Sequence, residues 1–168
     1  MPAMRFILPA VLSMSVLVSA CGFTLRGASL LPQAMSSMHL SAANLNSPLV
    51  EKLEGELSRA GVELLQDSAS ATTVLTIISD KADERVLSVS ARGEPQEYEL
   101  YHTVVFSMTS DGRTVLEPVT MTLTRDYFFD QQDILGKSED ARFLRDALAE
   151  DVARAVVRRA ALALRTGS

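Results

Sequence analysis

Residues 97–127 read EYELYHTVVFSMTSDGRTVLEPVTMTLTRDY, and this stretch decides the fold. From Tyr98 to Met108 apolar residues occupy every second position except that of His102, with mostly polar residues between them, which is typical of a strand with one buried face. Asp111-Gly112 is a strong hairpin signal, and the alternation resumes over Thr114–Tyr127. The stretch therefore predicts an antiparallel strand pair with a polar outer face, on which lie Thr120, Thr122 and Thr124.

The preceding segment predicts a strand and a helix. A first core strand is expected at residues 38–41. Ser47-Pro48 is typical of an N-cap followed by proline at the first helical position, and Gly61 is suited to the position just past a helix end. Leucines recur every four residues between these signals, so we expect an amphipathic helix over residues 48–60; they are Leu49, Leu53 and Leu57.

Two further β segments and a second helix complete the chain. β-branched residues predict a strand over 72–78, and a second β stretch covers residues 85–90. The polar run from Asp80 to Glu84 is either a bulge or the middle of one long strand. A loop over residues 130–138 then leads to a helix that is expected to start at Ser138-Glu139-Asp140 and to end near Leu164.

The resulting order is β-α-β-β-β-α. It predicts an α+β fold, a two-layer sandwich in which a mixed or antiparallel four-stranded sheet carries both helices on one face and leaves the other face open. On the last helix, Arg154, Arg158 and Arg165 lie at near-helical spacing, which predicts a solvated face.

The N-terminal residues have the pattern of a secretory signal, with Arg5 followed by an apolar stretch from Phe6 to Val18. This stretch is shorter than the roughly 20 residues that a membrane-spanning helix needs. Val18-Ser19-Ala20-Cys21 resembles the bacterial lipobox, in which the cysteine is acylated and the bond before it is cut; ordinary signal cleavage after Ala20 is the alternative. A lone cysteine in an exported chain favours lipidation, because it has no partner for an internal disulfide. The resemblance to a lipobox further implies sorting to the outer membrane, because the residue after the cysteine is Gly22 and not an aspartate.

Composition limits the class of partner. Removal of residues 1–20 leaves 148 residues with a formal charge of −6, because the whole chain carries −5 and Arg5 is the only charged residue removed. Nucleic acid is therefore not an expected partner. We expect residues 1–20 to be a lipoprotein signal peptide, residues 21–37 a lipidated tether and residues 38–168 a single domain.

Motifs for catalysis or metal binding are not apparent in the sequence. His39 and His102 fall on separate expected strands without metal-site spacing, and a packed or edge histidine is the favoured interpretation of His102. Glu97 and Glu99 are typical of a solvated sheet face. We therefore expect a protein that is not an enzyme and has no cofactor beyond the covalent lipid on Cys21.

One segment concentrates aromatic and charged residues at the end of the last strand, where loops often carry function. It contains Arg125, Tyr127, Phe128, Phe129 and Asp130. A structural interpretation is that the two phenylalanines close the core while the charged residues form local ion pairs. Lys137 follows in the expected loop, where a plain surface charge is the simpler interpretation.

Four short motifs stand in a characteristic order and spacing along the chain: residues 21–26, 61–65, 97–98 and 125–130. Together they resemble the motifs of the LptE family, whose members are outer-membrane lipoproteins of lipopolysaccharide assembly. The family fold is a two-layer α/β sandwich. The resemblance implies that the chain is lipid-anchored on the periplasmic side of the outer membrane, plugs the lumen of the β-barrel LptD in a 1:1 complex, binds lipopolysaccharide and assists its assembly into the outer leaflet.

The resemblance also implies ligand-binding residues. In the family, a basic residue in the turn before the Glu-Tyr strand and a lysine after the Tyr-Phe-Phe-Asp segment contact lipopolysaccharide, and Arg92 and Lys137 occupy these places. A direct match from Glu97-Tyr98 puts the basic position at Ala91, so the assignment of Arg92 requires that the turn absorb a one-residue offset. Two other functions are alternatives for this chain: an accessory or scaffold lipoprotein of another envelope machine, and a periplasmic hydrolase with a pocket lined by carboxylates or His102.

Overall fold

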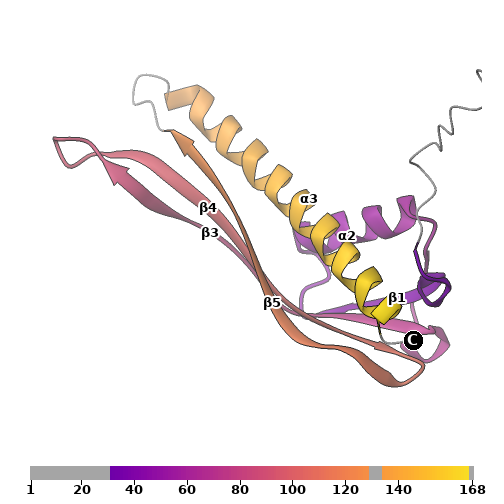
Figure 1. Ribbon diagram of the computed structural model, residues 1–168. Helices are drawn as coiled ribbons and strands as arrows, with labels where there is room; N and C mark the ends of the chain where they lie inside the picture. The colour runs from indigo at the N-terminus through magenta and orange to yellow at the C-terminus, as the bar shows by residue number, and fades with distance from the viewer. Residues whose placement is uncertain (1–30, 129–133, 167–168) are drawn as a thin grey trace, which may run out of the picture.

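The computed structural model describes residues 31–128 and 134–166, with the backbone alone for residues 134–140. The strands form one mixed sheet in the order β2-β1-β3-β4-β5, in which β1 is parallel to both its neighbours and β3, β4 and β5 are antiparallel. Both α-helices cover the same face of this sheet (Figure 1). The elements in chain order are η1 (Gln33–Met35), β1 (Ser37–Ala42), α2 (Pro48–Arg59), β2 (Glu63–Leu64), η2 (Ser68–Ser70), β3 (Thr73–Val89), β4 (Pro95–Ser110), β5 (Arg113–Phe128) and α3 (Ile134–Thr166).

Helix α2 forms where its capping signals predict. The Ser47 hydroxyl accepts a hydrogen bond from the Val50 amide at 3.2 Å, and Pro48 occupies the first turn. Gly61, with φ of +81°, adopts the left-handed conformation that lets the chain turn away from the helix. The predicted helix is therefore confirmed, and it buries Leu49, Val50, Leu53 and Leu57.

Strand β3 settles the alternative that the polar run left open. Residues 73–89 form one 17-residue strand, with register shifts between Ile77 and Ser79 and again between Val86 and Val89. The run from Asp80 to Glu84 is thus the middle of a long strand, and the irregularities lie before and after it. At about 3.3 Å per residue, such a strand is roughly 55 Å long. It extends past α2 together with β4 and β5, with α3 alongside (Figure 1).

The two faces of the sheet differ as the alternation predicts. In β4, residues from Leu100 to Ser110 are buried at every second position and face the helices. The opposite face carries the predicted threonine ladder, in which the Thr103 and Thr122 hydroxyls lie 2.9 Å apart across paired strands. The core lies between the sheet and the helices, and its fully buried members include Met38, Leu53, Leu75, Phe106, Met108, Val152 and Val156.

The structure corrects two predictions, the number of strands and the start of the second helix. The sheet has a fifth strand, β2, because Glu63 and Leu64 pair with β1; two residues are too few to show an alternation. Helix α3 begins at Ile134 rather than at Ser138, because Ser-Glu-Asp is tolerated within a helix as well as at its cap. Lys137 therefore lies in the first turn of α3 and not in a loop. Among the described helices, none is long and apolar enough to cross a membrane.

Candidate functional site

The turn between β3 and β4 displays Arg92. The Ser90 hydroxyl accepts hydrogen bonds from the amides of Arg92 and Glu94, each at 3.2 Å, and Gly93 has φ of +79°. These bonds fix the backbone, while the Arg92 side chain is exposed. Ala91 lies in the same turn, where the strict alternation of strand side chains does not hold.

The start of α3 lies at the same end of the molecule as this turn (Figure 1). Lys137 is in the first turn of that helix, so the two predicted ligand residues are carried by separate elements at one end of the sheet. Phe129 and Asp130, like Cys21, lie outside the described residues.

The described part of the Arg-Asp-Tyr-Phe segment joins the sheet to α3. The Arg125 guanidinium forms an ion pair with Asp151 of α3, and this contact is long-range rather than local. The hydrogen bond from Arg125, and a second one from Arg154, lower the pKa of Asp151. Phe128 is 82% exposed, so the interpretation that it closes the core was wrong.

Tyr127 belongs to a second contact between the sheet and α3. Its ring stacks on Tyr98 with centroids 5.5 Å apart, and its hydroxyl donates to Glu84 at 3.3 Å. Glu84 also accepts from Arg145 of α3 at 2.5 Å. Partial burial and the Glu84 carboxylate raise the pKa of Tyr127. These two polar contacts hold the extended part of the sheet against the helix.

The structure also brings together Ser47, Asp80 and His102, a set that a hydrolase could use. His102 is 4% exposed, and its Nε2 lies 2.5 Å from Asp80 Oδ1. Burial alone raises the pKa of Asp80, but hydrogen bonds from His102 and Ser47 outweigh it, so the pKa is lowered. The carboxylate lies between the other two groups, whereas nucleophilic catalysis needs the imidazole between hydroxyl and carboxylate.

The surroundings of this cluster point to a structural role. The hollow beside it, lined by Ser47, Ile77 and Asp80, has a volume of about 100 Å³, well below the roughly 300 Å³ of a small-molecule site. Ser47 is already engaged as the cap of α2, and His102 is a packed histidine, as its strand position predicts. Over the described ranges, no group of three or more His, Cys, Asp or Glu side chains is placed to hold a metal ion.

Sequence reasoning missed the contacts that join these residues. Asp80 lies on the neighbouring strand, 22 residues from His102, and Asp151 lies 26 residues from Arg125. Only the register of β3 against β4 and the path of α3 over the sheet bring these groups together. The alternation did place His102 on the apolar face, and that was the one signal available for the buried pair.

Comparison with known proteins agrees with the motifs. The family described as "LptE: Lipopolysaccharide-assembly" matches residues 35–160. LPS-assembly lipoprotein LptE of Yersinia enterocolitica is 26% identical over 91% of this chain and 74% of its own length. The protein of the same name from Pectobacterium atrosepticum is 24% identical over 89% and 82%.

Solved structures share the fold. The crystal structure of rare lipoprotein B from Shewanella oneidensis superposes with a TM-score of 0.70 at 25% identity, covering 77% of this chain and 97% of that one. The solution structure of lipoprotein B from Nitrosomonas europaea has a TM-score of 0.71 at 22% identity, covering 83% and 90%. These likenesses confirm the α+β sandwich of mixed sheet and two helices. The chain belongs to the LptE family of lipopolysaccharide-assembly lipoproteins.

Proposed function

We propose that this lipoprotein is anchored in the outer membrane through acylated Cys21, plugs the lumen of the β-barrel LptD in a 1:1 complex, binds lipopolysaccharide and assists its assembly into the outer leaflet without catalysing a reaction. The observation that carries the proposal is the polar open face of the sheet in a chain of this family. The interior of a membrane barrel is polar, so a plug needs a compact domain with a polar surface.

The residues of the open face support this role. Thr103 and Thr122 are joined by their hydroxyls, and Arg85 forms an ion pair with Glu99 at 2.6 Å. The Arg85 guanidinium also lies 5.8 Å from the centre of the Tyr101 ring. Charged and hydroxyl groups are thus paired across neighbouring strands at these positions. Such pairing suits a surface that meets another polar wall rather than a lipid.

For lipopolysaccharide we propose contacts from Arg92 and Lys137. Phosphate groups bind guanidinium as a planar fork and ammonium as a point charge. The exposed Arg92 side chain on a turn fixed by Ser90 is suited to reach a ligand at the end of the sheet. The change to test is the double substitution Arg92→Asp with Lys137→Asp.

The double variant should bind lipopolysaccharide at least about tenfold more weakly, since a charge-assisted hydrogen bond contributes roughly 1.5–3 kcal/mol. Binding is measured with purified lipopolysaccharide at fixed salt, and folding is checked by circular dichroism. Arg113→Asp is the control, because Arg113 is exposed at the start of β5, beside the end of β4 that lies opposite the Arg92 turn. Unchanged affinity in the double variant would reject these two residues as ligand contacts.

The LptD partnership is tested by co-purification of a tagged, lipidated chain in mild detergent. We expect a large β-barrel protein in 1:1 ratio. Recovery of other envelope proteins instead would favour the alternative, an accessory or scaffold lipoprotein of another assembly machine.

A further inference from the structure

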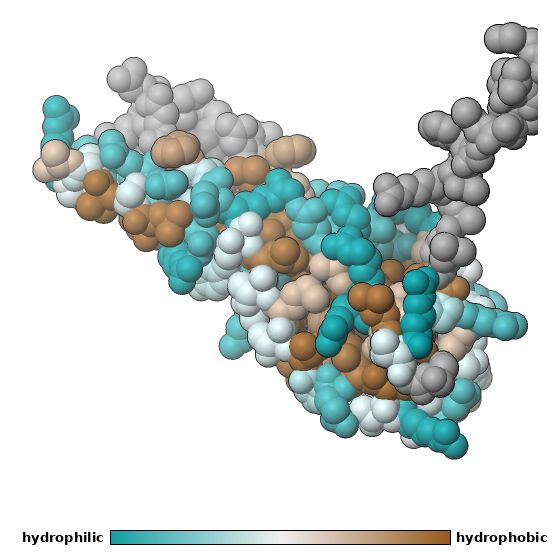
Figure 2. All heavy atoms as spheres, viewed as in Figure 1, coloured by the Kyte–Doolittle hydropathy of each residue, from teal (hydrophilic) through white to brown (hydrophobic). Residues whose placement is uncertain are grey.

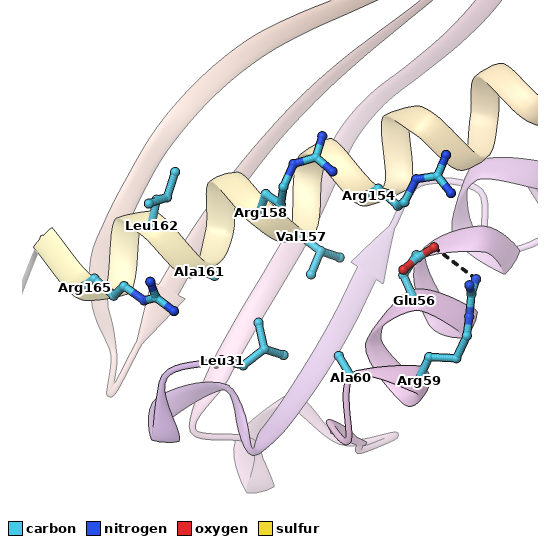
Figure 3. Close-up of a pocket in the computed structure, with 10 residues that line it drawn as sticks. All are labelled: Leu31, Glu56, Arg59, Ala60, Arg154, Val157, Arg158, Ala161, Leu162 and Arg165. Atoms are coloured by element: carbon cyan, nitrogen blue, oxygen red, sulfur yellow. Dashed lines mark ion pairs between the residues drawn. The ribbon is translucent and has the colours of Figure 1, made fainter. Parts of the chain in front are cut away.

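An open groove lies between α2 and the C-terminal half of α3, away from the turn that carries Arg92. Its volume is about 510 Å³, within the range of small-molecule sites. Apolar side chains line much of it, and Figure 3 shows Val157 and Ala161 of α3 across from Leu31 and Ala60. Such a lining can accept part of an acyl chain.

The rim of the groove is strongly cationic. Arg59, Arg154, Arg158 and Arg165 contribute to it, against the single carboxylate of Glu56 (Figure 3). The positive charge therefore exceeds the negative charge, in a chain whose overall charge is −5. Apolar lining and guanidinium rim together match a ligand with an acyl chain and an anionic phosphate.

The arginines differ in how they are engaged. Arg59 pairs with Glu56 at 3.1 Å, and Arg154 pairs with Glu150 and Asp151. Arg158 is exposed and has no ion pair with a side chain of the described ranges. Arg158 is thus the guanidinium best placed to exchange water for a ligand phosphate.

The short distance along the chain between the groove and Cys21 indicates which ligand is close to the groove. Leu31, in its lining, is ten residues after Cys21. Ten residues span at most about 35 Å when fully extended. An acylated Cys21 would therefore keep the groove within reach of the bilayer surface, where phospholipid head groups are abundant.

We propose that this groove binds an anionic phospholipid of the leaflet in which Cys21 is anchored, with the phosphate at Arg158 and an acyl chain along Val157, Ala161 and Leu162. The proposal rests on the lipid anchor of the proposed function but not on lipopolysaccharide binding at Arg92 and Lys137. Phospholipid bound here would orient the domain relative to the membrane, which the acyl anchor alone does not do.

The test uses the lipidated chain in a zwitterionic detergent with phosphatidylglycerol that carries a photoreactive diazirine in one acyl chain. After irradiation, mass spectrometry maps the labelled peptides. We expect labels at Leu31, Val157 and Leu162, competition by unlabelled phosphatidylglycerol, and little competition by phosphatidylcholine. Labels spread along the chain, or equal competition by both lipids, would overturn the proposal.

Two variants and a control separate the contribution of the Arg158 charge from that of the apolar Leu162 side chain. Arg158→Glu should lower labelling about tenfold, the effect of one charge-assisted hydrogen bond. Leu162→Asp should also lower it, and Leu162 is 51% exposed, so the fold should tolerate the change. Arg92→Glu makes the same charge change at the far end and should leave labelling unaltered; an equal loss there would show nonspecific charge attraction and overturn the site.

Two further outcomes would also overturn it. Stronger competition by lipopolysaccharide than by phosphatidylglycerol would make lipopolysaccharide the ligand of the groove. Crosslinks to residues 22–30 from a photoreactive amino acid placed at position 157, with no lipid label, would mean that the tether covers the groove. Loss of lipopolysaccharide binding in the Arg92 and Lys137 variant would leave the lipid labelling unchanged, so failure of one proposal is distinguishable from failure of the other.

Discussion

At the scale of single residues, Asp80 is a partly buried charge that links three elements of the fold. Its side chain is 20% exposed and receives hydrogen bonds from His102 of β4 and from Ser47 at the start of α2. One carboxylate thus joins β3 to a neighbouring strand and to a helix cap. Because the hydrogen bonds lower its pKa despite burial, the charged form of Asp80 stabilises the fold.

Asp80→Asn is expected to lower the free energy of unfolding by about 1.5–3 kcal/mol at neutral pH, as for the loss of a charge-assisted hydrogen bond. The folded pKa lies below the unfolded value of about 3.9. The contribution of Asp80 is therefore present above that value and is lost as the pH falls through the folded pKa.

Urea unfolding of the wild type and the variant from pH 7 to pH 3 checks this pH dependence. Asp126→Asn, on the exposed face of β5, is the control and should have little effect at any pH. A difference between wild type and Asp80→Asn that stays constant over this range would show that shape, not charge, is responsible.

At the scale of elements, sequence patterns predict those parts whose signals are local. The N-cap at Ser47 and the leucines of α2 fix that helix, and the alternation through β4 and β5 fixes both strands and their inner face. Strand β2 escaped prediction because a two-residue strand exists only through its pairing with β1. The start of α3 escaped prediction because a cap-like tripeptide does not by itself mark where a helix begins.

The contrast between the two strand faces gives an element-scale prediction. Phe106 of β4 is fully buried, so Phe106→Ala should lower the free energy of unfolding by about 3–5 kcal/mol through lost burial and a cavity. Phe128 of β5 is 82% exposed, and Phe128→Ala should change it by less than about 0.5 kcal/mol. Denaturant unfolding compares the two, and similar losses would mean that Phe128 is packed in solution.

At the scale of the whole molecule, the sites depend on contacts between distant segments. Glu84 meets Arg145 across 61 residues, and the groove combines Leu31 with α2 and the end of α3. Periodicity assigned Arg158 to a solvated face, which is correct for its exposure, but it could not show that Leu31 and α2 form the opposite wall. Composition and residue spacing thus predict the two layers of the fold and the family motifs. The contacts between residues far apart in the chain, such as Glu84 with Arg145, are seen only in the folded structure.

The central claim is that the domain plugs LptD with the open face of its sheet against the barrel wall. Thr122 points to the open face, and its neighbour Leu123, paired with His102, points to the helices. The most direct test places a photocrosslinking amino acid at each of these two positions in the lipidated chain, irradiates intact cells and identifies the adducts. We predict an adduct with LptD from position 122 and none from position 123; absence of an LptD adduct from position 122, in a chain that is folded and lipidated, would contradict the claim.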